Sequence, residues 1–112
     1  MNKALKVSII VPAHNEEENI PLLVEKFTEM FDSSNFSGEV VLVDDGSTDE
    51  TLKKAQELQK GSPFLKVVSH NTNRGITDAL VTGFNNSDGE IFVFWPADLQ
   101  YLPQDKIGRA HV

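Results

Sequence analysis

The sequence predicts an α/β protein whose parallel β-sheet is covered by helices on both faces. Four short, almost wholly apolar runs alternate with three longer segments in which apolar residues recur at helical spacing. Continuous apolar runs are typical of strands buried on both faces, as in parallel sheets. Because each connection contains a helix, the order β-α-β-α-β-α-β implies right-handed crossovers between strands that all point the same way.

The first strand is predicted over residues 6–12, where the apolar run stops at Pro12, which cannot donate to a sheet ladder. The loop that follows, 13–18, ends in three glutamates, which are favourable near a helix N-terminus. The next helix is predicted from an apolar stripe made of Ile20, Leu23, Val24, Phe27 and Phe31. A turn-rich segment, 32–38, leads back to the sheet.

The second strand is predicted over residues 40–43, and it ends abruptly in Asp-Asp-Gly at 44–46. Ser47 and Glu50 have the spacing of a capping box, in which the serine hydroxyl and the glutamate carboxylate bond each other's backbone N–H groups. This spacing predicts that a helix over 48–60 follows the acidic turn directly.

The remaining elements repeat the same pattern. Gly61 and Pro63 predict the end of the second helix, and a third strand is predicted over 65–70. A third helix is predicted from a stripe made of Ile76, Ala79, Leu80, Gly83 and Phe84. The fourth strand is predicted over 91–95, and its aromatic residues are expected in the core: Phe92, Phe94 and Trp95.

The functional site is expected at one edge of this sheet. In a parallel sheet the loops that follow the strands gather on the same edge, here 14–18, 44–49, 70–75 and 96–100. These loops carry carboxylates, amides, an arginine and two histidines, whereas the loops at the other edge contain mainly turn-forming residues. Open α/β sheets bind ligands at this edge, near the point where the strand order reverses.

The chemistry of this edge suits a phosphorylated ligand held through a metal. Neither Gly-x-Gly-x-x-Gly nor Gly-Lys-Ser/Thr, the patterns of phosphate-binding loops, occurs in the sequence. Asp44, Asp45 and Asp98 could instead hold Mg²⁺ or Mn²⁺, since these ions prefer oxygen ligands. Carboxylates can also accept hydrogen bonds from ribose hydroxyls and from a base N–H group.

Each of these residues also has a purely structural explanation. Asp-Asp-Gly after a strand is often only a turn, and a serine or aspartate before a helix often only caps it. Histidines in such loops are mostly surface or hydrogen-bonded groups, and an arginine there is commonly solvated. From the residues alone these explanations stay open for the acidic turn and for His14, His70, Arg74 and Asp98.

Composition narrows the class of protein. The 112 residues suffice for one domain, and the formal net charge of −7 argues against nucleic-acid binding. The sequence has no cysteine, which excludes disulfides and thiolate metal sites. Because no signal peptide and no run of bilayer-spanning length is found, we expect a cytoplasmic protein.

Four motifs in order make the chain resemble the N-terminal half of family 2 glycosyltransferases of the GT-A fold. They lie at residues 7–17, 43–49, 73–75 and 97–100, within a match that spans 6–105. The resemblance is strongest to the polyprenyl-phosphate, dolichyl-phosphate mannosyltransferase-like branch. It implies a Rossmann-like GT-A sheet and inverting transfer of a sugar from a GDP- or UDP-linked donor to a polyprenyl phosphate or glycan acceptor.

The resemblance also implies a set of site residues. Those expected to bind the nucleotide sugar are Pro12, Ala13, Asn15, Glu16, Asp44, Asp45, Gly46, Ser47, Arg74, Ala97 and Asp98. Asp98 and Gln100 are implied as ligands of Mg²⁺ or Mn²⁺, which would stabilise charge on the leaving diphosphate. The chain departs from the family at His14, where Tyr is common, and at Pro96, which replaces the first carboxylate of Asp-x-Asp.

The end of the chain carries a further expectation. Residues 107–112 coincide with a common sequencing-library adapter translated in one frame, so we expect a donor-binding domain over 1–106 and a non-native tail over 107–112. The acceptor half and any catalytic base are then expected beyond residue 112, and a full-length protein is expected at the cytoplasmic face of the membrane. The alternative is a non-catalytic nucleotide-binding fragment or module.

Overall fold

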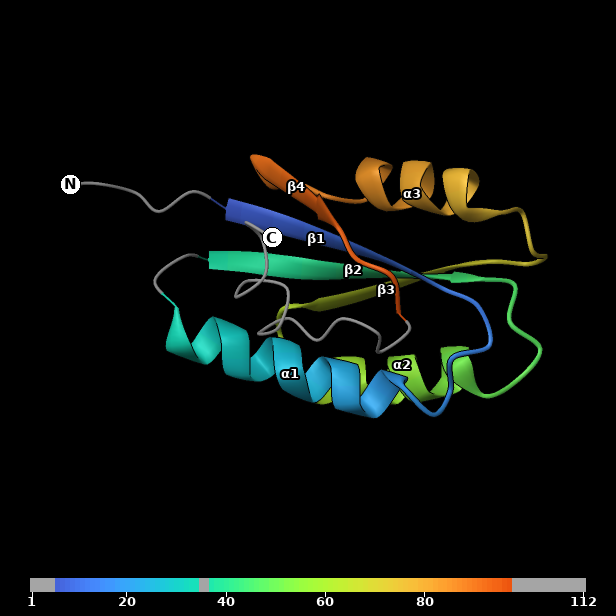
Figure 1. Ribbon diagram of the computed structural model, residues 1–112, viewed down its shortest axis with the longest axis horizontal. Helices are drawn as coiled ribbons and strands as arrows, with labels where there is room; N and C mark the ends of the chain where they lie inside the picture. The colour runs from blue at the N-terminus through green and yellow to red at the C-terminus, as the bar shows by residue number, and fades with distance from the viewer. Residues whose placement is uncertain (1–5, 35–36, 98–112) are drawn as a thin grey trace, which may run out of the picture.

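The computed structural model describes residues 6–34 and 37–97. The predicted alternation of strands and helices is confirmed (Figure 1). The expected metal ligands Asp98 and Gln100 and the expected tail, 107–112, lie outside the described residues. In chain order the elements are β1 (Lys6–Ala13), α1 (Ile20–Ser33), β2 (Ser37–Asp45), α2 (Thr51–Gly61), β3 (Leu65–His70), α3 (Ile76–Asn85) and β4 (Ile91–Phe94).

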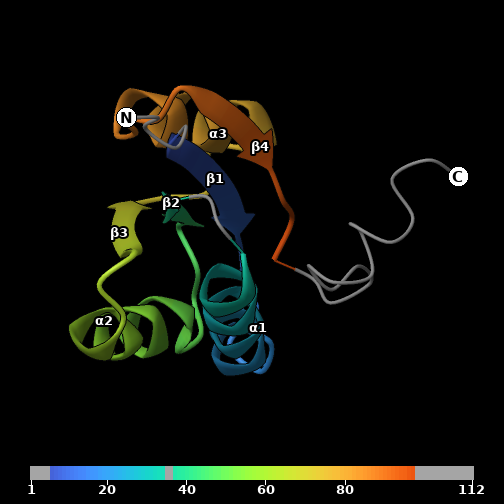
Figure 2. The same ribbon diagram turned by 90° about the vertical axis from the view of Figure 1, so that its left-hand side faces the viewer.

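The four strands form one parallel sheet in the order β3-β2-β1-β4. The chain moves outward from β1 to β3 and then crosses to the other side of β1, so the strand order reverses between β1 and β4. Helices α1 and α2 cover one face of the sheet, and α3 covers the other (Figure 2). The predicted parallel α/β architecture, with helices on both faces, is therefore confirmed.

The core is divided by the sheet into two unequal parts. The larger part lies under α1 and α2 and includes Phe27, Leu42 and Trp95, whose ring meets that of Phe27 edge to face at 5.7 Å. The smaller part, under α3, is formed by Val41, Val43 and Ala79. Because β2 is buried on both faces, its apolar residues run without alternation, as the sequence showed.

Helix α2 begins at Thr51, three residues later than predicted, and the predicted capping box is wrong. The Ser47 hydroxyl accepts a hydrogen bond from the Asn15 N–H group at 2.9 Å instead of capping the helix. The Asp49 carboxylate accepts from the Thr51 N–H group at 2.9 Å. The start of α2 is thus shaped by a contact with another loop, which local spacing does not encode.

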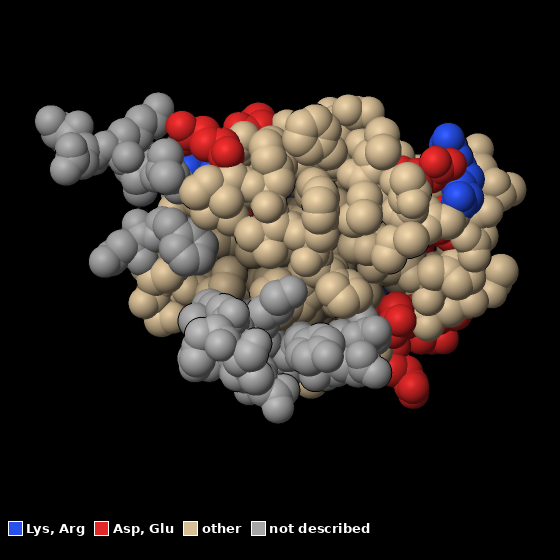
Figure 3. Space-filling view, turned by 45° about the horizontal axis from the view of Figure 1, so that its top comes forward, with Lys and Arg blue, Asp and Glu red and all other residues tan. Residues whose placement is uncertain are grey.

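The face around α3 and β4 shows few charged residues (Figure 3), and several large apolar side chains are exposed there, among them Val81, Phe84 and Phe94. Phe84 and Phe92 pack against each other with ring centroids 4.6 Å apart, yet both remain exposed. The expectation of a buried aromatic cluster holds for Trp95 and is wrong for Phe92 and Phe94, because β4 lies at the edge of the sheet. None of the helices among the described residues has the length and apolar character needed to cross a bilayer.

Close packing of α3 on the sheet depends on Gly83. A Cβ atom at this position would lie 2.3 Å from Cγ2 of the fully buried Ile10. We expect Gly83→Ala to lower the free energy of unfolding by about 1–3 kcal/mol, because overpacking outweighs the gain in helix propensity. Urea denaturation measures the change. Gly61→Ala in α2 is the control, since a Cβ there meets nothing within 4 Å, and equal effects of the two substitutions would contradict the packing argument.

Candidate functional site

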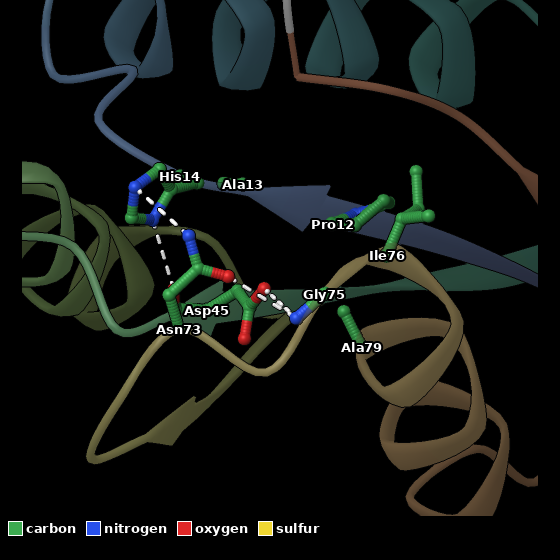
Figure 4. A pocket seen from close by; sticks show the side chains of 8 residues that line it. All are labelled: Pro12, Ala13, His14, Asp45, Asn73, Gly75, Ile76 and Ala79. Atoms are coloured by element: carbon green, nitrogen blue, oxygen red, sulfur yellow. Dashed lines mark hydrogen bonds between the residues drawn. The ribbon is translucent and has the colours of Figure 1, made fainter.

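Three loops meet at the carboxyl edge of the sheet, where the sequence predicted the site. They follow β1, β2 and β3. A pocket of about 250 Å³ lies here beside the start of α3, between the ends of β1 and β2 and the loop after β3 (Figure 4). Of the predicted site residues, Pro12, Ala13 and Asp45 line this pocket. The pocket is also lined by residues that were not among the predicted ones: His14, Asn73, Gly75, Ile76 and Ala79. Asn73 and Gly75 flank Arg74 in the third motif, a signal that could have identified them.

Asp45 organises the loop between β3 and α3. Its carboxylate accepts hydrogen bonds from Nδ1–H of His70 at 2.8 Å and from the N–H groups of Arg74 and Gly75, both at 2.9 Å. Burial by itself raises the pKa of this carboxyl, but the hydrogen bonds from Arg74, His70 and Gly75 outweigh it, so the pKa of Asp45 lies below its usual value. Asp45 therefore stays charged and fully engaged by the protein.

His70 is a satisfied buried group and not a surface residue. It is 8% exposed, and its second ring nitrogen, Nε2, lies 2.7 Å from the Thr82 hydroxyl on α3. The structural explanation of His70 as a hydrogen-bonded group is thus confirmed. Through this ring, β2, β3 and α3 are joined in one hydrogen-bonded chain.

Asp44, the neighbouring aspartate, has a different environment. It is 2% exposed, its Oδ2 atom accepts a long bond of 3.4 Å from the Ser47 N–H group, and its Oδ1 atom has no protein partner. Adjacent residues of a strand point to opposite faces, so Asp44 and Asp45 do not form a paired carboxylate site. Leaving a buried acceptor without any hydrogen-bond donor costs about 1–3 kcal/mol, so the Oδ1 atom of Asp44 is suited to accept a hydrogen bond from a group outside the protein.

The loops after β1 and β2 are joined by side chain to backbone hydrogen bonds. Asn15, which adopts a positive φ of 54°, accepts at Oδ1 from the N–H groups of Thr48 at 2.9 Å and Asp49 at 3.3 Å. The Glu16 N–H group donates to the Thr51 hydroxyl at 2.8 Å. These contacts give Asn15, Glu16 and Ser47 a structural role at the edge, and their expected contacts with a nucleotide stay predictions.

A second, acidic hollow of about 190 Å³ lies beside the start of α1. It is lined by Asn15, Glu16, Glu17, Glu18, Asn19 and Asp49.

Gly46 allows the loops after β2 and β3 to touch. Its φ is +67°, and a Cβ atom would lie 2.2 Å from the Thr72 carbonyl carbon.

Arg74 is half exposed, and its guanidinium pairs with Asp78 one helical turn away at 3.3 Å. Ala97, by contrast, is buried. Within 6–34 and 37–97 no group of three potential metal-binding side chains occurs.

Comparison with known sequences decides the family. Residues 8–110 match the sequence profile of Glycosyl transferase family 2. The chain belongs to this family.

Curated members of glycosyltransferase family 2 resemble the chain over most of its length. It is 39% identical over 100 residues to the dolichol-phosphate mannosyltransferase of Pyrococcus furiosus. This alignment covers 89% of the chain and 28% of that protein. The chain is 35% identical over 104 residues to the undecaprenyl-phosphate 4-deoxy-4-formamido-L-arabinose transferase of Proteus mirabilis, covering 92% and 32%. The chain therefore corresponds to about the N-terminal third of these relatives.

Solved structures of glycosyltransferases share the fold. The mannosyltransferase PcManGT from Pyrobaculum calidifontis, in complex with GDP-Man and Mn²⁺, superposes with a TM-score of 0.70 at 33% identity, covering 86% of this chain and 28% of that one. S. aureus TarS 1-349 in complex with UDP-GlcNAc gives 0.71 at 33% identity, covering 84% and 27%. The expected Rossmann-like GT-A sheet is thereby confirmed for this family 2 chain.

Asp45 makes the stability of this family 2 domain sensitive to acid. Because its pKa is lower in the folded than in the unfolded chain, its contribution is complete above the unfolded value of about 3.9 and is lost as the pH falls through the folded value. We expect Asp45→Asn to lower stability at neutral pH by about 1–3 kcal/mol and to flatten the loss of stability as the pH falls below about 4. Denaturant unfolding across this pH range measures both effects. Asp32→Asn at the end of α1 is the control, and an acid slope in Asp45→Asn equal to that of the unsubstituted chain would refute the assignment.

Proposed function

We propose that the chain is the donor-binding part of an inverting glycosyltransferase that moves a sugar from a GDP- or UDP-linked donor to a polyprenyl phosphate. The observation that carries the proposal is Asp44, a buried carboxylate with an unpartnered oxygen, in the second family motif at the ligand-binding edge of the sheet. The names of the relatives support the choice of acceptor, since they are transferases acting with dolichol phosphate or undecaprenyl phosphate.

The pocket suits a nucleoside. Pro12, Ile76 and Ala79 supply apolar walls, while His14 and Asn73 supply polar groups at one side. A ring system with a polar edge meets both needs, because small-molecule sites combine apolar walls with a few placed polar groups. Asp44 does not line this pocket, because it points to the opposite face of the sheet from Asp45. A donor that extends past the end of β2 would place a ribose hydroxyl or a base N–H group on the Asp44 oxygen that the protein leaves unpaired.

Mg²⁺ or Mn²⁺ is the expected cofactor, held by Asp98 and Gln100. The solved complex of PcManGT contains Mn²⁺, which supports divalent metal use in this fold. When bound, the ion would neutralise charge on the leaving diphosphate. The exposed Arg74 guanidinium lies at the same edge and could exchange its surface pair with Asp78 for a phosphate oxygen.

A polyprenyl phosphate acceptor would require no catalytic base from this part of the chain. A polyprenyl phosphate is already anionic at neutral pH, so its oxygen can attack the anomeric carbon without a general base. A single in-line attack inverts the configuration at that carbon. The reaction would take place at the cytoplasmic face of the membrane that holds the lipid, with the acceptor-binding residues and any base supplied beyond residue 112.

A second candidate function is nucleotide binding without transfer. One observation favours it: Pro96 replaces the first carboxylate of Asp-x-Asp. Titrating the 112-residue chain with GDP-mannose or UDP-sugars, with and without Mn²⁺, separates the two. Binding that is strengthened by the metal and loses this gain in Asp98→Ala supports the transferase, whereas binding that does not depend on the metal supports the binding module.

Donor binding is tested by calorimetric titration of GDP and UDP with and without Mn²⁺. We expect one nucleotide to bind more tightly with the metal, and Asp98→Ala to abolish that increment. Asp44→Asn should weaken binding about tenfold, or about 1.4 kcal/mol, in both conditions, because it puts an N–H group where an acceptor is needed. Glu25→Gln on the exposed side of α1 is the control. Absence of nucleotide binding, or wild-type affinity in Asp44→Asn, would overturn the proposal.

A further inference from the structure

The His14 ring lies where three loops of the carboxyl edge meet (Figure 4). Its Nδ1 atom is 2.9 Å from the backbone carbonyl oxygen of Asp45, at the end of β2. Its Nε2 atom is 3.3 Å from Nδ2 of Asn73, in the loop after β3, and 3.4 Å from Nδ2 of Asn15, in its own loop. The ring also lines the pocket.

The contact with Asp45 fixes one ring nitrogen. A carbonyl oxygen only accepts hydrogen bonds, so Nδ1 of His14 must carry a hydrogen.

The two amides fix the other ring nitrogen, because their orientations are determined elsewhere. The Asn15 oxygen accepts from the N–H groups of Thr48 and Asp49, and the Asn73 oxygen accepts from the Gly75 N–H group at 3.1 Å. Turning either amide over would set its NH₂ group against those N–H donors. Both amides therefore present N–H groups to Nε2 of His14, which must be a bare acceptor.

We infer that His14 is a positioning residue: in the neutral Nδ1–H tautomer it ties the loop that carries Asn73 to the ends of β1 and β2, and so holds the wall of the pocket. A ring with hydrogen on Nε2 would meet two N–H donors and release Asn73. The effect on nucleotide affinity rests on the proposed function, whereas the tautomer and the loop contacts do not.

The tautomer is tested first, by long-range ¹H–¹⁵N correlation spectra of the ¹⁵N-labelled 112-residue chain near neutral pH. We expect His14 to show a protonated Nδ1 and an unprotonated Nε2. Asn73→Ala should increase the share of the other forms, while Asn86→Ala should not, because the Asn86 amide donates to the Thr82 carbonyl at the far end of α3. A dominant Nε2–H form, or protonation of both nitrogens, would overturn the inference.

Three substitutions of His14 then separate hydrogen bonding from ring size, with GDP and UDP as probes. His14→Asn keeps a donor near Nδ1, His14→Gln keeps an acceptor near Nε2, and His14→Phe keeps a ring with neither. We expect His14→Phe to weaken nucleotide binding about tenfold. His14→Asn and His14→Gln should each weaken it less, because each keeps one of the two hydrogen bonds of the ring. Unchanged affinity in His14→Phe would overturn the positioning role. If the unsubstituted chain binds no nucleotide, the proposed function fails, and the spectra still decide the tautomer.

Discussion

The carboxyl edge of this domain depends on the hydrogen bonds that Asp45 accepts. Burying a carboxylate is unfavourable unless several donors replace the lost water, and here β3 supplies the His70 ring and the next loop supplies the N–H groups of Arg74 and Gly75. The same residue offers its carbonyl oxygen to His14. One residue at the end of β2, which is buried over residues 39–45, therefore fixes the start of α3 and the loop after β1, and both line the pocket.

Much of the fold could be predicted from sequence, because the local pattern of each strand and helix agrees with its place in the folded domain. The strand β2 contains an uninterrupted apolar run, residues 40–43, and the helices carry one apolar stripe each, so the alternation of elements could be predicted. The failures have a common cause in contacts between distant segments. Ser47 is bonded by Asn15, 32 residues away, which displaces the start of α2. The crossing of the chain to the outer side of β1 leaves Phe94 at a sheet edge, a position that spacing alone does not reveal.

The pocket lies at the strand ends, where the sequence predicted a site, but the roles of its residues could not be assigned from their types. Asp44 and Asp45 look equivalent in sequence, yet the pleat of the strand sends them to opposite faces, where one is saturated with donors and the other keeps an unpaired oxygen. His14 has an ordinary surface explanation until the orientations of the surrounding amides are known. The kinds of polar groups at the carboxyl edge can thus be predicted from sequence. The role of each group cannot, because it depends on which loops contact each other in the folded chain.

Helix α3 is held at both ends by buried carboxylates, and this arrangement bears on how the pocket binds. At the amino edge, Glu39 accepts from the Ser8 hydroxyl at 2.6 Å and from the Asp88 N–H group at 2.9 Å, which fixes the connection from α3 to β4. At the carboxyl edge, Asp45 holds its start, and between them Gly83 seats the helix against Ile10. The pocket wall is consequently formed during folding, without help from a ligand. A ligand that enters a wall already in place loses less conformational entropy on binding, so the proposed nucleotide affinity would depend on how well the fold holds α3.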